Sequence, residues 1–208
     1  MTVRQATLRD LGGVTATIAA AFAIDPVWEV ALRRADGSVG HHAAYWRIFV
    51  DAAHDQGGVW LIEDGAAVSI WIPPGGSELS DGAAAVLEEF NEAALGDLGA
   101  REMTELYERF ESTHPAGPSH AYLSLLATHP DHRGRGIGQG MLGADLARWD
   151  DLGVPGYLES TNPGNDHRYE RAGFRRVGGF RAVRDDAPIT TMWRDVGGSG
   201  RPDDASSG

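Results

Sequence analysis

The spacing of hydrophobic and polar positions divides the chain into short strands and longer helices. The opening residues alternate in character, and a stripe of apolar side chains with helical spacing follows over residues 11–22. Thr7 is followed three residues later by Asp10, a variant of the pattern that caps the start of a helix. Asp25 precedes a proline, which disfavours helix at that position. These features predict a strand and then a helix that ends before Asp25.

The middle of the chain has the pattern of a helix, a hairpin and then two more helices. Helical spacing predicts a helix over residues 41–54, after a shorter helical segment. Two β-rich runs follow and meet at Asp64-Gly65, a dipeptide typical of the tight turn of an antiparallel hairpin. Residues 79–112 are rich in Ala, Leu and Glu and are interrupted by glycines at 95–100, so two helices are expected there.

The last third begins with residues 120–128, a nearly continuous apolar run of the kind found in strands buried on both faces. A helix is expected next, because its apolar positions fall on one stripe. These positions are Ile137, Met141, Leu142, Leu146 and Trp149. The pattern then predicts a strand over residues 156–161, a short helix over 166–172, and two strands around 175–183 and 189–193.

These elements are expected to form one domain over residues 1–196. A chain of 208 residues and 22.2 kDa is large enough to bury roughly 70% of its unfolded surface around a single core. Residues 197–208 are rich in Gly, Ser and Asp and have almost nothing apolar to bury, which predicts a disordered tail.

Composition narrows the classes of function. The chain has no cysteine, which excludes disulfides, a thiolate nucleophile and cysteine metal sites. A formal net charge of -12 argues against a nucleic-acid partner and favours a cationic small molecule, although acidic residues also simply keep a surface soluble. The sequence shows neither a signal-peptide pattern nor the ~18 to 20 continuous apolar residues of a membrane span. A cytoplasmic protein with no membrane partner is expected.

The stretch from Thr128 to Leu142 carries the clearest chemical signal. Glycines and two arginines, Arg133 and Arg135, lie between the apolar run and the following helix. A strand, a glycine-rich turn and a helix start form an anion site, because free backbone N–H groups and the helix dipole favour negative charge. Arginines add permanent charge suited to bidentate phosphate contacts. The expected ligand of this segment is a diphosphate.

Spacing excludes two common diphosphate motifs. The Walker loop needs a lysine, and the chain has none. The dinucleotide fingerprint G-x-G-x-x-G fails from Gly134, because its third glycine is Gln139, and fails from Gly136, because that position is Met141.

The segment Arg133-Gly134-Arg135-Gly136-Ile137-Gly138 instead resembles the R/Q-x-x-G-x-G/A loop with which the GNAT acetyltransferases hold the pyrophosphate of acetyl-CoA. The preceding strand, the following amphipathic helix and the next strand fit the context of that loop. The family's later asparagine, tyrosine and Gly-Phe pair are matched by Asn165, Tyr169, Gly173 and Phe174. The resemblance covers the whole chain and is closest to the puromycin N-acetyltransferases.

This resemblance implies a fold and a cofactor site. The fold is an α/β (α+β) GNAT fold, in which helices flank both faces of a mixed, mostly antiparallel central sheet that is split near the strand before the glycine loop. Acetyl-CoA is the co-substrate. Its expected site consists of Leu126, Ala127, Thr128, Arg133, Gly134, Arg135, Gly136, Ile137, Gly138 and Asn165. The histidines at 129 and 132 suggest a metal, but loop histidines beside an aspartate are usually solvated, and no metal site is expected.

The resemblance also implies catalytic and acceptor residues. Tyr169 is the candidate proton donor to the leaving thiolate, and Glu159 the candidate base, with an outward-facing or structurally paired carboxylate as the alternative for Glu159. An aromatic side chain flanked by carboxylates suits an aromatic cationic amine. The acceptor wall is therefore expected to contain Asp25, Trp28, Glu29 and, although a core role is favoured for it, Tyr122.

The expected function is direct transfer of acetyl from acetyl-CoA to a primary amine of a small molecule, such as puromycin or a related aminonucleoside. Three other acceptors stay open: an aminoglycoside, a polyamine and a protein N-terminus. A non-catalytic acyl-CoA-binding module is a further alternative. The chain is expected to act as a monomer or homodimer.

Overall fold

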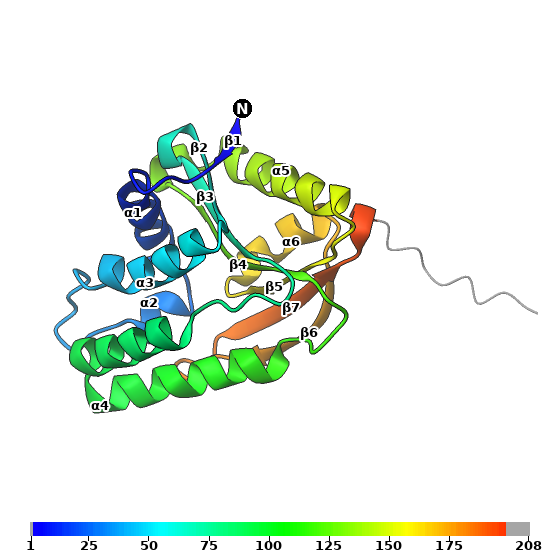
Figure 1. Cartoon of the computed structure of the whole chain (residues 1–208). Coiled ribbons are helices and arrows are strands. Elements are labelled where there is room, and N and C mark those ends of the chain that lie inside the picture. Colours follow the sequence, from blue (N-terminus) through cyan, green and yellow to red (C-terminus); the bar gives the residue numbers. More distant parts are fainter. Residues whose placement is uncertain (1, 199–208) are drawn as a thin grey trace, which may run out of the picture.

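The computed structural model describes residues 2–198 (Figure 1). The strands are β1 (Val3–Gln5), β2 (Val59–Ile62), β3 (Ala67–Ile72), β4 (Ala121–Thr128), β5 (Gly156–Ser160), β6 (Arg175–Arg181) and β7 (Pro188–Arg194). The helices are α1 (Leu11–Phe22), α2 (Trp28–Ala31), α3 (His42–Asp55), α4 (Asp81–Thr113), α5 (Ile137–Asp151) and α6 (Pro163–Arg171). Short 3-10 helices lie at η1 (Glu63–Gly65), η2 (Pro130–His132) and η3 (Val196–Gly198).

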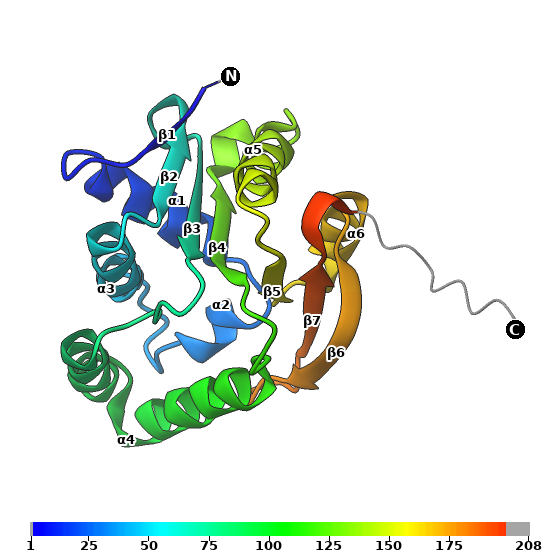
Figure 2. The same cartoon turned by 45° about the vertical axis from the view of Figure 1, so that its right-hand side comes forward.

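The strands form one seven-stranded sheet in the order β1-β2-β3-β4-β5-β7-β6. Every neighbouring pair is antiparallel except β4 and β5, which run parallel. Helices α1 to α4 lie on one side of the sheet, and α5 and α6 lie on the other (Figure 2). The predicted fold class, a mostly antiparallel sheet with helices on both faces, is confirmed. The strands and helices expected from the sequence all occur, with ends shifted by a few residues.

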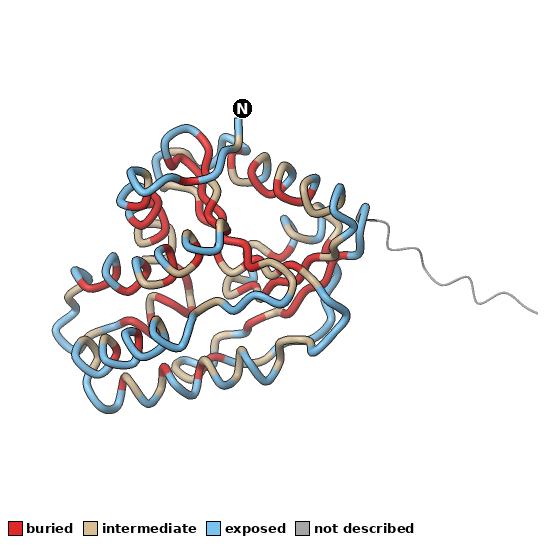
Figure 3. The backbone as a smooth tube through the Cα atoms, in the orientation of Figure 1, coloured by how far each residue is buried: buried red, intermediate tan, exposed pale blue. Residues whose placement is uncertain are grey.

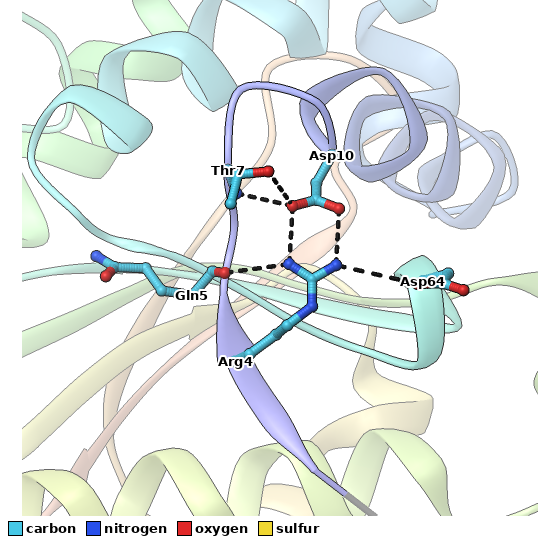
Figure 4. A network of polar contacts seen from close by, with 5 residues as sticks. All are labelled: Arg4, Gln5, Thr7, Asp10 and Asp64. Atoms are coloured by element: carbon cyan, nitrogen blue, oxygen red, sulfur yellow. Dashed lines mark hydrogen bonds and ion pairs between the residues drawn. The ribbon is translucent and has the colours of Figure 1, made fainter.

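The start of α1 is fixed by a polar network around Asp10 (Figure 4). Its carboxylate accepts hydrogen bonds from the backbone N–H and the hydroxyl of Thr7, at 2.8 and 2.7 Å, and is bridged by both terminal nitrogens of Arg4. These donors hold the pKa of Asp10 well below its ordinary value. The predicted Thr7–Asp10 capping pattern is therefore only half formed. The Asp10 side chain accepts hydrogen bonds from residues before the helix and from none within it.

The turn of the β2–β3 hairpin differs from the two-residue turn that Asp64-Gly65 predicts. Glu63, Asp64 and Gly65 form η1 and have φ angles of 46°, 54° and 100°. Three consecutive residues with positive φ reverse the chain, and only the last of them is the residue type suited to it. In α4 the expected break falls at Gly96, with φ 70° and ψ 174°, so one continuous ribbon consists of two helices at an angle.

Strand β4 changes face at a bulge. Its register with β3 shifts between Ile70 and Trp71, where Ser124 is the extra residue. Before the bulge, Leu123 packs against the α5 side of the sheet, and after it Leu125 packs against the α1 and α3 side. Burial along β4 alternates between buried and half-buried residues, whereas the sequence predicted burial on both faces. The half-buried positions border the cavities described below, which explains the difference.

Buried residues follow the strands and recur along the helices (Figure 3). The largest cluster lies between α1, α3, α4 and the sheet, and the fully buried Trp46 and Tyr45 of α3 belong to it. On the other side, α5 covers Trp71, whose indole Nε1–H donates to the buried carboxylate of Asp145 at 2.9 Å. The two cores hold the sheet rigidly at the point where β4 and β5 separate.

Two sequence predictions concern the chain's ends and environment. The predicted tail of residues 197–208 lies outside the described residues, except for Gly197 and Gly198 at the end of η3. Among residues 2–198, no helix combines the length and the apolar composition needed to cross a bilayer.

Candidate active site

The parallel strands β4 and β5 pair only at their beginnings. Ala121 pairs with Gly156 and Tyr122 with Tyr157, and no later residue of β4 is bridged to β5. Beyond this point β1 to β4 and the group β5, β7 and β6 diverge (Figure 2). Backbone N–H and C=O groups on that edge of β4 therefore lack a strand partner, which an extended ligand chain can supply.

A cavity of about 430 Å³ lies at the end of β4, against the start of α5. Nine of the ten residues predicted to hold CoA line it: Leu126, Ala127, Thr128, Arg133, Gly134, Gly136, Ile137, Gly138 and Asn165. The exception is Arg135, whose exposed side chain is not among the lining residues. Arg133 also reaches across the cavity mouth, where its Nη2 donates to the backbone oxygen of Ala21 at 3.3 Å.

The glycines of this loop have distinct local roles. Gly134 and Gly136 have φ angles of 78° and 75°, a left-handed conformation that glycine adopts without strain. Gly136 is the residue that caps α5, so the helix's first N–H groups face the cavity end of the loop. A Cβ atom at Gly138 would lie 2.4 Å from the hydroxyl of Thr128, so this glycine lets α5 pack directly against β4. These features are compatible with the close approach of a diphosphate, whose binding by this loop stays a prediction.

Helix α6 turns two side chains toward the divergence of β4 and β5. It begins at Asn162, whose side-chain oxygen accepts from the N–H of Gly164 at 3.0 Å, and Pro163 occupies its first turn. Asn165 and Tyr169, four residues apart on one face, line both this cavity and a smaller enclosed one beyond it. Burial, reinforced by the nearby carboxylate of Asp25, raises the pKa of Tyr169 to about 12. Its hydroxyl therefore stays protonated at neutral pH and is available as a proton donor.

The smaller cavity contains most of the predicted acceptor wall. Asp25, Trp28, Tyr122 and Glu159 line it. Asp25 is buried and accepts from the backbone N–H of Val27 and Trp28 and from the hydroxyl of Thr161, at 3.0, 3.2 and 2.8 Å. Burial raises its pKa despite these donors. Asp25 thus joins the start of α2 to the end of β5.

Glu29 is the predicted wall residue that the structure does not bring to the cavity. Its carboxylate is exposed and pairs with Arg33 one helical turn later, at 2.8 Å. Consecutive residues of a helix point in different directions, so Trp28 faces the cavity whereas its neighbour Glu29 does not.

Glu159 occupies the centre of the site. Its side chain is only 2% exposed, and neither carboxylate oxygen meets hydrogen-bond geometry with a donor within residues 2–198, although the hydroxyls of Tyr122 and Tyr157 lie close enough to interact with it. Burial and the Glu159 carboxylate together raise the pKa of Tyr122 and Tyr157 well above the ordinary tyrosine value. A buried carboxylate that lines a cavity is placed to accept a proton from a ligand bound there. The outward-facing alternative considered for Glu159 is therefore wrong.

A second carboxyl group, Glu78, lies near Glu159 in the same cavity. The hydroxyl of Ser124, at the β4 bulge, donates to it. Burial and the negative charge of Glu159 raise the pKa of Glu78 to about 7, against the opposing effect of the Ser124 hydrogen bond. Sequence analysis missed Glu78, because a single glutamate in a Gly-Ser-rich loop carries no signal of burial. Ser124 was visible as a lone polar residue in an apolar strand.

Two histidines extend from Glu159 toward solvent. His120 Nδ1 lies 2.8 Å from the backbone oxygen of Pro118, which can only accept, so this nitrogen carries a proton. In a neutral His120 the Nε2 atom then accepts from His114 Nε2, 3.0 Å away. His114 consequently presents an unprotonated Nδ1 to Glu159, at 3.6 Å. The Glu159–His114 pair can take up one proton and pass it toward the surface.

Comparison with known proteins matches the region that forms this site. The sequence model of the family described as "Acetyltransferase (GNAT) domain" matches residues 85–176, which include β4, the glycine loop, α5, β5 and α6. Among curated proteins, the chain is 28% identical over 142 residues to a mycothiol acetyltransferase of Propionibacterium freudenreichii, an alignment that covers 66% of this chain. The chain spans only 38% of the length of that relative.

Solved structures share the fold over nearly the whole chain. A structure from Corynebacterium glutamicum, described as histone acetyltransferase HPA2 and related acetyltransferase, has a TM-score of 0.65 and 23% identity, and covers 97% of this chain and 98% of its own. Arylalkylamine N-acetyltransferase 2 from Aedes aegypti has a TM-score of 0.65 at 11% identity, with 94% and 98% covered. At these identities the similarity shows a common fold.

Proposed function

We propose that this chain, which the comparisons support as an N-acetyltransferase of the GNAT family, transfers acetyl from acetyl-CoA directly to a primary amine of a small molecule. The main support for this proposal is that two cavities meet between the diverging strands β4 and β5. One is bordered by the anion-binding loop, the other contains the buried Glu159, and Asn165 and Tyr169 border both.

The chain's residues divide the binding of acetyl-CoA between them. Backbone N–H groups of the loop at 134–138 and the guanidinium of Arg133 hold the diphosphate, and the free edge of β4 at Leu126 to Thr128 pairs with the amide-bearing arm. Asn165 lies where it can contact the arm near the thioester. When bound, acetyl-CoA supplies an activated acyl group, the thioester.

The pKa of the acceptor amine determines how much a general base such as Glu159 can contribute to the rate. An alkylamine with a pKa of about 10.4 must give up its proton at a cost of roughly 4 to 5 kcal/mol at pH 7, whereas an α-amino group near 7.7 to 8.0 costs only about 1 kcal/mol. Glu159 is buried and lines the acceptor cavity, which places its carboxylate to accept that proton. His114 and His120 then carry the proton outward.

The residues of the site can account for every proton moved in the acetyl transfer. Glu159 accepts one proton from the ammonium, and the free amine forms a bond to the carbonyl carbon as the carbon–sulfur bond breaks. Tyr169 donates its phenolic proton to the departing thiolate and recovers one from the newly acylated nitrogen. The products are the N-acetyl amine, free CoA and one proton delivered to solvent.

The acceptor within this proposal is a small-molecule amine. The resemblance of the sequence to puromycin N-acetyltransferases adds puromycin and related aminonucleosides to the candidates, with antibiotic resistance as the corresponding role. The similarity to a mycothiol acetyltransferase and to an arylalkylamine N-acetyltransferase adds amines related to mycothiol and arylalkylamines. Aminoglycosides, polyamines and protein N-termini complete the panel.

The test is a screen of acetyl-CoA turnover with this panel, read by release of free thiol and by mass spectrometry of the acetylated amine. Titration calorimetry with CoA is measured in parallel. Acetylation of at least one amine, lost in Glu159→Gln, supports the proposal. Binding of CoA with no turnover of any amine would point instead to the non-catalytic acyl-CoA-binding module, and absence of CoA binding would reject the assignment of the loop.

A further inference from the structure

A large groove connects the buried Glu159 to solvent on the α4 side of the sheet. Its volume is about 1230 Å³, and its walls come from the β3–α4 loop, both halves of α4 and the segment at 114–120. Glu78, Tyr107, Tyr122 and Glu159 belong both to this groove and to the small enclosed cavity. The reacting end of an acceptor placed at Glu159 would therefore continue outward along the groove.

Negative charge dominates the groove. Seven acidic side chains line it, namely Glu78, Glu88, Glu92, Asp97, Glu108, Glu111 and Glu159, against one arginine, Arg101. No ion pair with an arginine is formed by any of the seven in the described part of the chain; only Glu159 has a basic neighbour, the imidazole of His114. The wall thus presents a field attractive to cations.

Two other acidic side chains of α4 are paired with arginines. Glu102 pairs with Arg184, and Glu105 pairs with Arg109, and neither glutamate lines the groove. Asp81 and Glu89 lie outside the groove without such a pair among the described residues, so the groove differs from the rest of α4 in how many carboxylates it gathers on one wall.

The inner end of the groove supplies an independent indication of a cationic ligand. The Glu159 side chain is only 2% exposed, faces the groove and meets hydrogen-bond geometry with no donor within residues 2–198, while the hydroxyls of Tyr122 and Tyr157 lie near it. Burial of a carboxylate is costly, and a bound ammonium group is the partner that would relieve the cost. Between the two ends, Ile72, Leu79 and Leu87 provide apolar surface suited to a methylene chain.

We propose that the acceptor is a linear amine with at least two positive charges, whose reactive ammonium meets Glu159 while a second cationic group lies against the acidic wall of α4. The inference rests on the proposed acetyl transfer and narrows its substrate class. The inference favours polyamine-like acceptors over amines with a single positive charge. An aminonucleoside with one amine belongs to the disfavoured group.

The test compares matched acceptors that differ only in the second charge. The pairs are 1,6-diaminohexane with 1-aminohexane, and spermidine with a monoamine of similar length. The expected kcat/KM is at least about tenfold higher for the dication at low salt, and the ratio falls as ionic strength rises, because exposed charge pairs are screened. Equal kcat/KM for both members of a pair at low salt would overturn the inference.

Variants locate the effect in the groove. In the double variant Glu88→Gln/Glu92→Gln the KM for the diamine is expected to rise by about five- to twentyfold, from the loss of two exposed charge contacts. This rise should exceed the change for the monoamine by at least about fivefold. Glu89→Gln is the matched control, because Glu89 is exposed on the same helix, carries the same charge and does not line the groove. An equal effect from Glu89→Gln would assign the preference to net charge and overturn the inference.

Binding separates this inference from the proposed function. Titration calorimetry of the CoA-loaded protein with the same diamine and monoamine needs no turnover. If no amine is acetylated but the diamine binds more tightly than the monoamine and loses affinity in Glu88→Gln/Glu92→Gln, the proposed reaction fails and the cation groove stands. If amines are acetylated while both bind equally, the groove assignment fails and the acetyl transfer stands.

Discussion

The imidazole Nδ1 of His114 and the carboxylate Oε1 of Glu159 lie 3.6 Å apart. His120 continues this pair toward the surface through its contacts with the backbone oxygen of Pro118, at 2.8 Å, and with His114 Nε2, at 3.0 Å. When His114 carries a proton, its contact with Glu159 is an ion pair, so a proton released by the acceptor can be held at this position.

The first prediction concerns Glu159→Gln. We expect kcat/KM to fall by about 10² to 10⁴-fold for an alkylamine of high pKa, the usual contribution of a general base, and by much less for an amine of low pKa. The free energy of unfolding should be unchanged or higher, because the variant removes a buried charge. Kinetics with both amines and urea denaturation check this. Loss of activity accompanied by lower stability would mean that Glu159 has a structural role.

The second prediction tests the histidine pair. His114→Asn should lower kcat at low pH more than at high pH, because the acceptor's proton no longer has a direct path outward and free amine becomes abundant only as pH rises. The measurement is the pH profile of kcat from about pH 6 to 9. A uniform reduction at every pH would contradict the relay and indicate a packing effect.

The third prediction separates catalysis from binding at Tyr169. Tyr169→Phe removes the only hydroxyl of that ring and keeps its packing against Phe174. We expect CoA affinity within about twofold of the unmodified protein and kcat lower by roughly 10² or more, in the range of a lost proton donor. Calorimetry with CoA and steady-state kinetics check the two parts. Weaker CoA binding with unchanged kcat would assign Tyr169 to the binding of CoA alone.

The fold could be predicted from the sequence because its signals are local. The glycine-rich break at 95–100, the apolar stripe of α5 and the two β-rich runs of the hairpin each depend on neighbours within a few residues. The same holds for the anion-binding loop, where Gly134 and Gly136 adopt the backbone conformation for which glycine is suited. Local rules of this kind apply before any tertiary contact is known.

The acceptor side of the site could not be predicted in the same way. Glu78, Ser124 and Glu159 come from a loop and two strands, and their proximity depends on the bulge in β4 and on the separation of β4 from β5. Glu29 was assigned to the wall from sequence proximity to Trp28, and the geometry of α2 turns it to solvent. Whether a charge is buried depends on packing that no local pattern encodes.

The fourth prediction tests the anion-binding loop with a charge. Space around a Cβ at Gly136 is open, with no atom within 4 Å, and Asp and Asn tolerate its left-handed backbone better than other residues. Gly136→Asp should weaken CoA binding by about tenfold or more, because it sets a carboxylate beside the diphosphate. Gly136→Asn, of the same shape without the charge, is the control and should lose less. Equal affinities in both variants would contradict a diphosphate at this position.

The last prediction follows from the raised pKa of Glu78. Its folded pKa of about 7 lies above the ordinary value of 4.5, so the folded state keeps a proton that the unfolded chain has already lost. Between these two values the folded state binds more protons, and the stability contributed by this group declines as pH rises, by at most about 3.4 kcal/mol in total at 1.36 kcal/mol per pH unit. In Glu78→Gln this contribution disappears. The free energy of unfolding, measured by denaturation from about pH 5 to 8, should therefore fall less steeply with pH in the variant than in the unmodified protein. Parallel curves for the two proteins would show that Glu78 titrates normally, and that its carboxylate is charged in the folded site at neutral pH.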